Sequence, residues 1–125
     1  MARSRAVMAA AMIGNGANLE RGEAYCRQVI ANGEDPERLP STYATLAESL
    51  QAQGRYEEAA TAARTVTETY PYSTWASYAA LIQADCTYSL GKKAEALELA
   101  DEMIRLYPNT DYAEAAKRRK EIAWR

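Results

Sequence analysis

The feature that most constrains the fold of this 125-residue chain is a recurrence with a spacing of 37 residues. Tyr70-Pro71 returns as Tyr107-Pro108. Six more residues return at the same spacing, namely Gly54, Glu58, Ala59, Ala63, Ala76 and Ala79 as Gly91, Glu95, Ala96, Ala100, Ala113 and Ala116. Such a period is typical of one supersecondary unit stacked on copies of itself, because a single unit cannot bury its apolar face. It predicts an extended binding surface rather than a closed catalytic pocket.

Glycine and proline punctuation divides the chain into seven predicted helices. They span about Ala2–Ile13, Asn18–Asn32, Ser41–Gln53, Tyr56–Thr69, Ser73 or Thr74 to Leu90, Lys93–Leu106, and Asp111 to the C-terminus. Turns are expected at Gly14–Ala17, Gly33–Pro40, Gly54–Arg55, Pro71–Tyr72, Gly91–Lys92 and Pro108–Thr110. We expect Ser41 to cap its helix, and Asp111 with Glu114 to form a capping-box-like start. Apolar residues in the fourth and sixth helices follow one helix face, so the chain is predicted to be all-α, with antiparallel pairs.

The second unit resembles a tetratricopeptide repeat. The resemblance rests on Tyr43, Leu46, Ala47, Leu50, Gly54, Tyr56, Ala59, Ala63, Val66 and Pro71. The next unit keeps Ala84, Gly91, Ala96, Ala100 and Pro108 but departs at Gln83, Thr87 and Lys93, and residues 6–36 fit only through Met12, Ala24, Ala31 and Pro36. The Tyr-Pro junctions are similar to those of bacterial envelope-assembly and Tol-Pal-associated repeat proteins.

This resemblance implies a single domain, folded as a right-handed α-solenoid. Residues 1–40 would form a degenerate first repeat, 41–72 the second, 73–110 the third, and 111–125 a polar capping helix. The small residues Ala59 and Ala96 would be buried where the two helices of a repeat cross.

Composition indicates a folded soluble chain, with 48% apolar and 26% charged residues. A net charge of −2 provides no long-range field for nucleic acid or an anionic membrane, and no stretch approaches the roughly 20 apolar residues of a membrane span. Cys26 and Cys86 lie within helical patterns and are expected to be small buried hydrophobic residues. The basic run 117–120 is expected to be a solvated helix end, with Glu114–Arg118 and Lys117–Glu121 pairs.

We predict no catalytic, cofactor-binding or metal-binding residues, and hence no enzyme. The chain has no histidine, which removes the Ser-His-Asp and Cys-His arrangements and the common histidine metal motifs. Gly14 and Gly16 lack the third glycine and the strand of a nucleotide loop. Glu57 and Glu58 point about 100° apart around a helix and do not converge.

The candidate site is the concave groove that the resemblance assigns to the first helix of each pair. In this register the helix at 41–53 presents Ala44, Glu48 and Gln51, and the helix at 73–90 presents Tyr78, Leu81, Asp85 and Tyr88. These residues suit an amphipathic or extended peptide, including one with a basic residue. The alternative is that Tyr78 and Tyr88 pack against neighbouring helices. Glu48 and Asp85 would repel a terminal carboxylate.

Two functions follow as hypotheses. The first is a non-catalytic scaffold that binds a protein or peptide in the groove. The second is a structural subunit that self-associates through its end helices, for instance the one bearing Trp124, within a bacterial envelope complex. Arg3 and Arg5 before the apolar run Ala6–Ile13 allow either a first stacked helix, which favours a cytoplasmic location, or a signal peptide, which would place the protein in the periplasm.

Overall fold

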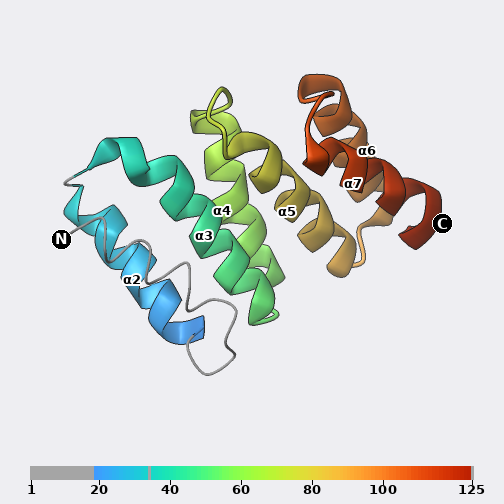
Figure 1. Cartoon of the computed structure of the whole chain (residues 1–125). Helices are drawn as coiled ribbons and strands as arrows, with labels where there is room; N and C mark the ends of the chain where they lie inside the picture. The colour runs from blue at the N-terminus through green and yellow to red at the C-terminus, as the bar shows by residue number, and fades with distance from the viewer. Residues whose placement is uncertain (1–18, 34, 125) are drawn as a thin grey trace.

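A computed structural model describes residues 19–33 and 35–124 of the chain. In chain order the helices are α2 (Leu19–Asn32), α3 (Leu39–Ala52), α4 (Tyr56–Thr69), α5 (Ala76–Ser89), α6 (Lys93–Leu106) and α7 (Asp111–Arg118). A 3-10 turn, η2 (Pro36–Arg38), precedes α3, and a π-helical turn, η3 (Arg119–Ala123), follows α7. The described residues contain no strand, and Figure 1 shows the helices following one another from α2 at one end to α7 at the other. The predicted helix 2–13 and the turn Gly14–Ala17 lie outside the described residues.

The period of the sequence is also the period of the backbone. Both ends of α5 lie 37 residues after those of α3, and α2, α4 and α6 begin and end 37 residues apart. Sequential packing of α2 on α3, α3 on α4, α4 on α5 and α5 on α6 gives the predicted α-solenoid of helix pairs. We call α3, α5 and α7 the first helices, and α2, α4 and α6 the second helices.

The register of the first repeat differs from the weak match found in the sequence. Buried Gly22 stands 37 residues before Ala59, and buried Cys26 stands 37 residues before Ala63. Ala24 and Ala31, through which this segment was matched, are exposed. The repeat is therefore better preserved than its residue types suggest, because a glycine and a cysteine are also small enough for the helix contacts.

The turns within the two complete pairs are confirmed at Gly54 and Gly91, which have φ angles of 78° and 83°. In each turn the residue after the glycine closes the helix with a six-to-one hydrogen bond. The Arg55 amide donates to the Leu50 carbonyl at 2.9 Å, and the Lys92 amide donates to the Thr87 carbonyl at 3.2 Å. This is the Schellman arrangement, and it requires the left-handed backbone that glycine adopts without strain.

The predicted start of α3 is wrong. The helix begins at Leu39 rather than Ser41 and includes Pro40, which we expected to lie in a loop. Proline is tolerated there because the first turn of a helix has no internal acceptor for its N–H groups. Ser41 is no cap, and its hydroxyl donates to the Arg38 carbonyl at 3.0 Å.

Two further helix starts also differ. α5 begins at Ala76, after a turn, and has no side-chain cap. α7 is capped by Thr110 and not by Asp111, since the Thr110 hydroxyl accepts from the Ala113 amide at 3.1 Å. The capping position is therefore one residue earlier than predicted, and Asp111 adds a favourable charge to the first turn.

The core is rich in alanine, as predicted. Ala59 and Ala96 are fully buried, and this lets the helices of each pair approach closely. Cys26 and Cys86 are buried as small hydrophobic residues. Burial raises the pKa of the Cys26 thiol to about 11 and that of Cys86 to about 12, so both stay protonated at neutral pH.

A polar cluster joins the first repeat to the second. The Glu23 carboxylate on α2 accepts from Arg27 at 3.0 Å, from Arg55 at 2.6 Å and from Gln53 at 3.2 Å. Burial alone would raise the pKa of Glu23, but the three hydrogen bonds and the Arg55 charge lower it overall. A buried carboxylate with this many donors stays ionised and fixes α2 against the turn between α3 and α4.

Candidate functional site

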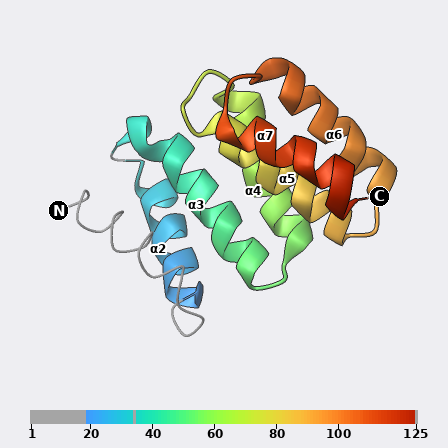
Figure 2. The ribbon, with the colours of Figure 1, turned by 45° about the vertical axis from the view of Figure 1, so that its right-hand side comes forward.

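The first helices lie side by side, with α3 against α5 and α5 against α7. We call the surface that they form the first-helix face, and Figure 2 shows α7 lying across α5 on this side. The seven predicted groove residues lie on α3 and α5. Ala44 is fully buried and Leu81 is buried, so these two contribute packing, whereas Glu48, Gln51, Tyr78, Asp85 and Tyr88 keep part of their surface exposed.

Asp85 is occupied by the C-terminal segment. The guanidinium of Arg119 donates to both carboxylate oxygens, from Nε to Oδ1 at 3.0 Å and from Nη2 to Oδ2 at 3.2 Å. A bidentate arginine–carboxylate pair is among the stronger and more directional polar contacts in proteins. The pair fixes the end of α7 on α5.

Tyr88 is covered by the same segment. Its ring stacks on the Trp124 indole with ring centroids 4.9 Å apart and an interplanar angle of 9°. Trp124 is 4% exposed. In this structure, therefore, Tyr88 packs against a neighbouring element, which was the alternative to a free groove residue. We call Arg119, Trp124 and the η3 turn between them the C-terminal cap.

We predicted that α7 would run unbroken to the C-terminus, but it ends at Arg118 and is followed by η3. The C-terminal cap explains this difference. The Trp124 amide donates to the Arg119 carbonyl at 2.7 Å, across five residues rather than four. This wider turn is the irregularity of η3, and the two side chains that bound it both reach α5. The prediction failed because a π turn is selected by tertiary contacts and not by local sequence.

The basic run 117–120 is not simply solvated. Lys117 pairs with Glu114 at 3.1 Å, while Arg119 and Lys120 pair with acidic residues of other helices, Asp85 and Asp101. The predicted pairs of Glu114 with Arg118 and of Lys117 with Glu121 are not formed. Three of the four cations are thus engaged within the chain.

The other end of α5 carries an aromatic cluster, which we define as Trp75, Tyr78 and Tyr112. The Tyr78 ring lies 6.5 Å from Trp75, edge to face, and 5.0 Å from Tyr112. Trp75 is 41% exposed and Tyr112 is 37% exposed, so the cluster is open to solvent. Burial, the Glu48 charge and a hydrogen bond with Glu48 all raise the pKa of Tyr78. The hydroxyl therefore stays protonated beside the Glu48 carboxylate.

Sequence reasoning missed two members of this cluster. Trp75 and Tyr112 stand 37 residues apart, each just before or within the first turn of a first helix. They are a recurrent aromatic position that the same comparison would have found. They were overlooked because Trp and Tyr share chemistry but not identity.

The family model for the tetratricopeptide repeat matches residues 45–73 and 78–110. These two segments are tetratricopeptide repeats. They coincide with most of α3–α4 and α5–α6, the two complete helix pairs. No curated protein matches the sequence significantly. Tetratricopeptide repeats generally mediate binding between proteins.

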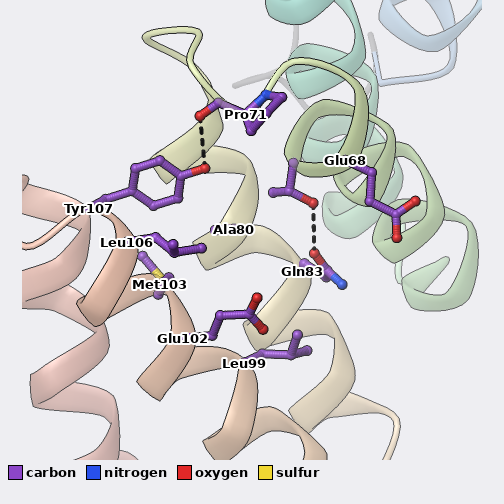
Figure 3. A pocket seen from close by; sticks show the side chains of 10 residues that line it. Glu68, Pro71, Ala80, Gln83, Leu99, Glu102, Met103, Leu106 and Tyr107 are labelled. Carbon is purple, nitrogen blue, oxygen red and sulfur yellow. Dashed lines mark hydrogen bonds between the residues drawn. The ribbon is translucent and has the colours of Figure 1, made fainter.

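Hollows also lie on the opposite side of the tetratricopeptide repeats, the second-helix face, formed by α2, α4 and α6. One of about 340 Å³ lies between α2 and α4. Two others, of about 240 and 130 Å³, lie along the furrow between α4 and α6. Figure 3 shows the hollow of about 240 Å³ from close by.

In the described part of the chain, no helix is long and apolar enough to cross a membrane. Within residues 19–33 and 35–124, no group of three or more potential ligands is placed to hold a metal ion.

Proposed function

We propose that the chain is a non-catalytic interaction module that binds a segment of a partner protein on its first-helix face. The proposed contact is the aromatic cluster together with Glu48, with Gln51 one turn further along α3. Half-exposed aromatic rings supply large apolar contacts at little entropic cost, and they are enriched in protein interfaces. The chemistry of Glu48 carries the proposal.

Glu48 stands 37 residues before Asp85, so the two carboxylates occupy the same place in successive repeats. Asp85 binds the guanidinium of Arg119, the first residue of η3, directly after the next first helix. The residue 37 positions before Arg119 is Ile82, which is buried and has no charge. Glu48 therefore has the position that binds a cation in the next repeat, and no ion pair with a described residue satisfies it.

The partner chemistry follows from these groups. A lysine or arginine would pair with Glu48 and could lie over an aromatic ring, and an adjacent apolar side chain would cover Trp75 or Tyr112. Asp85 and Tyr88, proposed from the sequence as further contacts, become available to a partner when it displaces the C-terminal cap. The engagement of Lys117, Arg119 and Lys120 by carboxylates supports a protein partner rather than nucleic acid.

The test is affinity capture from cell extract followed by mass spectrometry, with the wild type and two variants, Trp75→Ala and Glu48→Lys. Proteins that bind at this site should be enriched at least tenfold by the wild type and lost by both variants. Tyr72→Ala is the matched control, because Tyr72 is fully exposed in the same loop and outside the cluster. Circular dichroism checks folding. Equal capture by folded wild type and variants would refute the site.

Self-association is the second candidate function. Ile122 in η3 is 75% exposed, an apolar side chain on the end element of the stack. If it mediates assembly, the mass measured by light scattering should rise with concentration, and Ile122→Asp should restore the monomer. A constant monomer mass would remove this candidate.

A further inference from the structure

The hollow of about 240 Å³ lies between α4 and α6, on the side of the molecule opposite the proposed contact. Its walls include Leu99 and Leu106 from α6 and Glu68 from α4, and Ala80 of α5 forms part of its floor. Figure 3 shows Tyr107 reaching the Pro71 carbonyl at one end and Glu102 near the other. A drug-sized ligand or cofactor usually needs more than about 300 Å³, so this volume suits one or two side chains.

The preceding repeat serves as an internal control for what the fold itself requires. Its residues at the positions of Leu99 and Leu106 are Ala62 and Thr69. Helices α4 and α6 nevertheless have the same length, and each follows its first helix at the same spacing along the chain. Packing of the repeat therefore does not need a leucine at the position of Leu106, whereas Leu99 also packs against the buried core of its repeat. Leu106 is 56% exposed and lines the same hollow as the partly buried Leu99, so the hollow presents apolar surface from both leucines to solvent.

The hollow also carries two acidic residues at positions where the preceding repeat has uncharged ones. Glu68 and Glu102 line it where the preceding repeat has Ala31 and Thr65. Neither carboxylate forms an ion pair with a described residue, and no lysine or arginine is among the residues that line the hollow. In the hollow between α2 and α4, by contrast, Glu58 is paired with Arg27 and Arg55.

We propose that this hollow is a second docking site, separate from the first-helix face, for a partner segment that presents an aliphatic side chain beside a lysine or arginine. The aliphatic side chain enters between Leu99 and Leu106 and removes their apolar surface from water. The cation pairs with Glu68 or Glu102 at the rim. Two hydroxyl groups of the hollow already have acceptors, since Thr67 donates to Gln83 at 3.4 Å and Tyr107 donates to Pro71 at 3.0 Å, so neither needs an acceptor from the entering group.

The test uses a repeat-swap variant of the full chain in which four residues take the identities found 37 positions earlier. The substitutions are Glu68→Ala, Leu99→Ala, Glu102→Thr and Leu106→Thr. The probe is a fluorescein-labelled octapeptide of alternating lysine and leucine, with a Lys-Ser and a Glu-Leu octapeptide for comparison. Binding is followed by fluorescence anisotropy. Glu98→Ala with Glu121→Ala is the charge control, because it also removes two carboxylates, and neither lines the hollow.

With Trp75→Ala added to each protein to remove the contact proposed on the first-helix face, we expect the Lys-Leu probe to bind the otherwise wild-type chain and the charge control equally, and the repeat-swap variant at least tenfold more weakly. The Lys-Ser and Glu-Leu probes should bind the wild type at least tenfold more weakly than Lys-Leu. Equal binding of Lys-Leu by the folded repeat-swap variant would overturn the inference, as would equal binding of either comparison probe.

Two other outcomes also decide the matter. Loss of Lys-Leu binding in Trp75→Ala but not in the repeat-swap variant that keeps Trp75 would place the probe on the first-helix face. That result would overturn this inference while leaving the proposed function intact. A wild-type mass that rises with concentration and returns to monomer in the repeat-swap variant would assign the hollow to a second copy instead.

Discussion

Replacing Trp124 with alanine tests whether the C-terminal cap is part of the cooperative stack. The indole is 4% exposed and stacks on Tyr88 at 4.9 Å. An aromatic side chain buries about 150–250 Å², which at about 25 cal/mol per Å² sets an upper range of about 4–6 kcal/mol. Buried Trp→Ala changes typically cost about 3–5 kcal/mol. We expect about 3 kcal/mol, at the lower end, because Ile122 and Ala123 beside it are exposed and can readjust.

The chain provides its own reporter for this experiment. It contains two tryptophans, and Trp75 is 41% exposed whereas Trp124 is buried. Trp75→Phe therefore leaves the cap indole as the single tryptophan, whose emission can be followed selectively. Urea unfolding of this variant should give the same midpoint by tryptophan fluorescence and by circular dichroism at the helix band, since cap and repeats unfold together. Trp124→Phe, which keeps an aromatic ring over Tyr88, should lose much less stability than Trp124→Ala.

Two results would refute this reasoning. A loss below about 1 kcal/mol in Trp124→Ala would mean that the stacked ring contributes little beyond surface contact. A fluorescence midpoint clearly below the dichroism midpoint would mean that the cap detaches before the repeats unfold. In that case Asp85 and Tyr88 would be accessible in the native ensemble, and the sequence-based proposal for these two residues would gain support.

Three further predictions concern the repeats. Gly54→Ala and Gly91→Ala should each lower the free energy of unfolding by about 1–2 kcal/mol, measured in urea. A Cβ at either position would meet nothing within 4 Å, so the cause is strain in the left-handed backbone. An alanine variant as stable as the wild type would contradict this. Ala59→Leu and Ala96→Leu should each cost about 1–3 kcal/mol by overpacking a fully buried contact, and parental melting of both would contradict the register. Because the pKa of Glu23 is lowered in the folded state, its carboxylate stabilises the fold above the ordinary pKa of 4.5, and this stability is lost as pH falls through the folded pKa. In Glu23→Gln the melting temperature should therefore depend less on pH between about pH 6 and pH 3. A pH dependence equal to that of the wild type would contradict this.

The fold was predictable because its determinants are local and repeated. Gly54 and Gly91 end helices through their own backbone geometry, and Tyr70-Pro71 and Tyr107-Pro108 mark the junctions between repeats. The 37-residue period then fixes which helices are equivalent. The helix start near Pro40 was predicted wrongly because two local rules compete there: proline cannot continue a helix, but it is accepted in the first turn.

The candidate site was less predictable because its state depends on contacts between distant residues. Asp85 and Tyr88 lie on the helix that the sequence predicts for them, but nothing in the sequence pairs them with Arg119 and Trp124. A bidentate ion pair across 34 residues and a stacked ring require the relative position of α5 and α7. Sequence periodicity gives the face of each helix and not the side chain that covers it.

Comparison of one repeat with the next nevertheless separates two kinds of residue in this chain. Ala59 and Ala96 are identical and fully buried, so stacking alone accounts for them. Leu106 stands where the preceding repeat has Thr69, and it is exposed, so stacking does not account for it. Glu48 has the same charge as its counterpart Asp85 but lacks the arginine that satisfies it. The proposed apolar contact on the second-helix face therefore includes a position at which the internal symmetry fails, and on the first-helix face the symmetry fails at the arginine that would pair with Glu48.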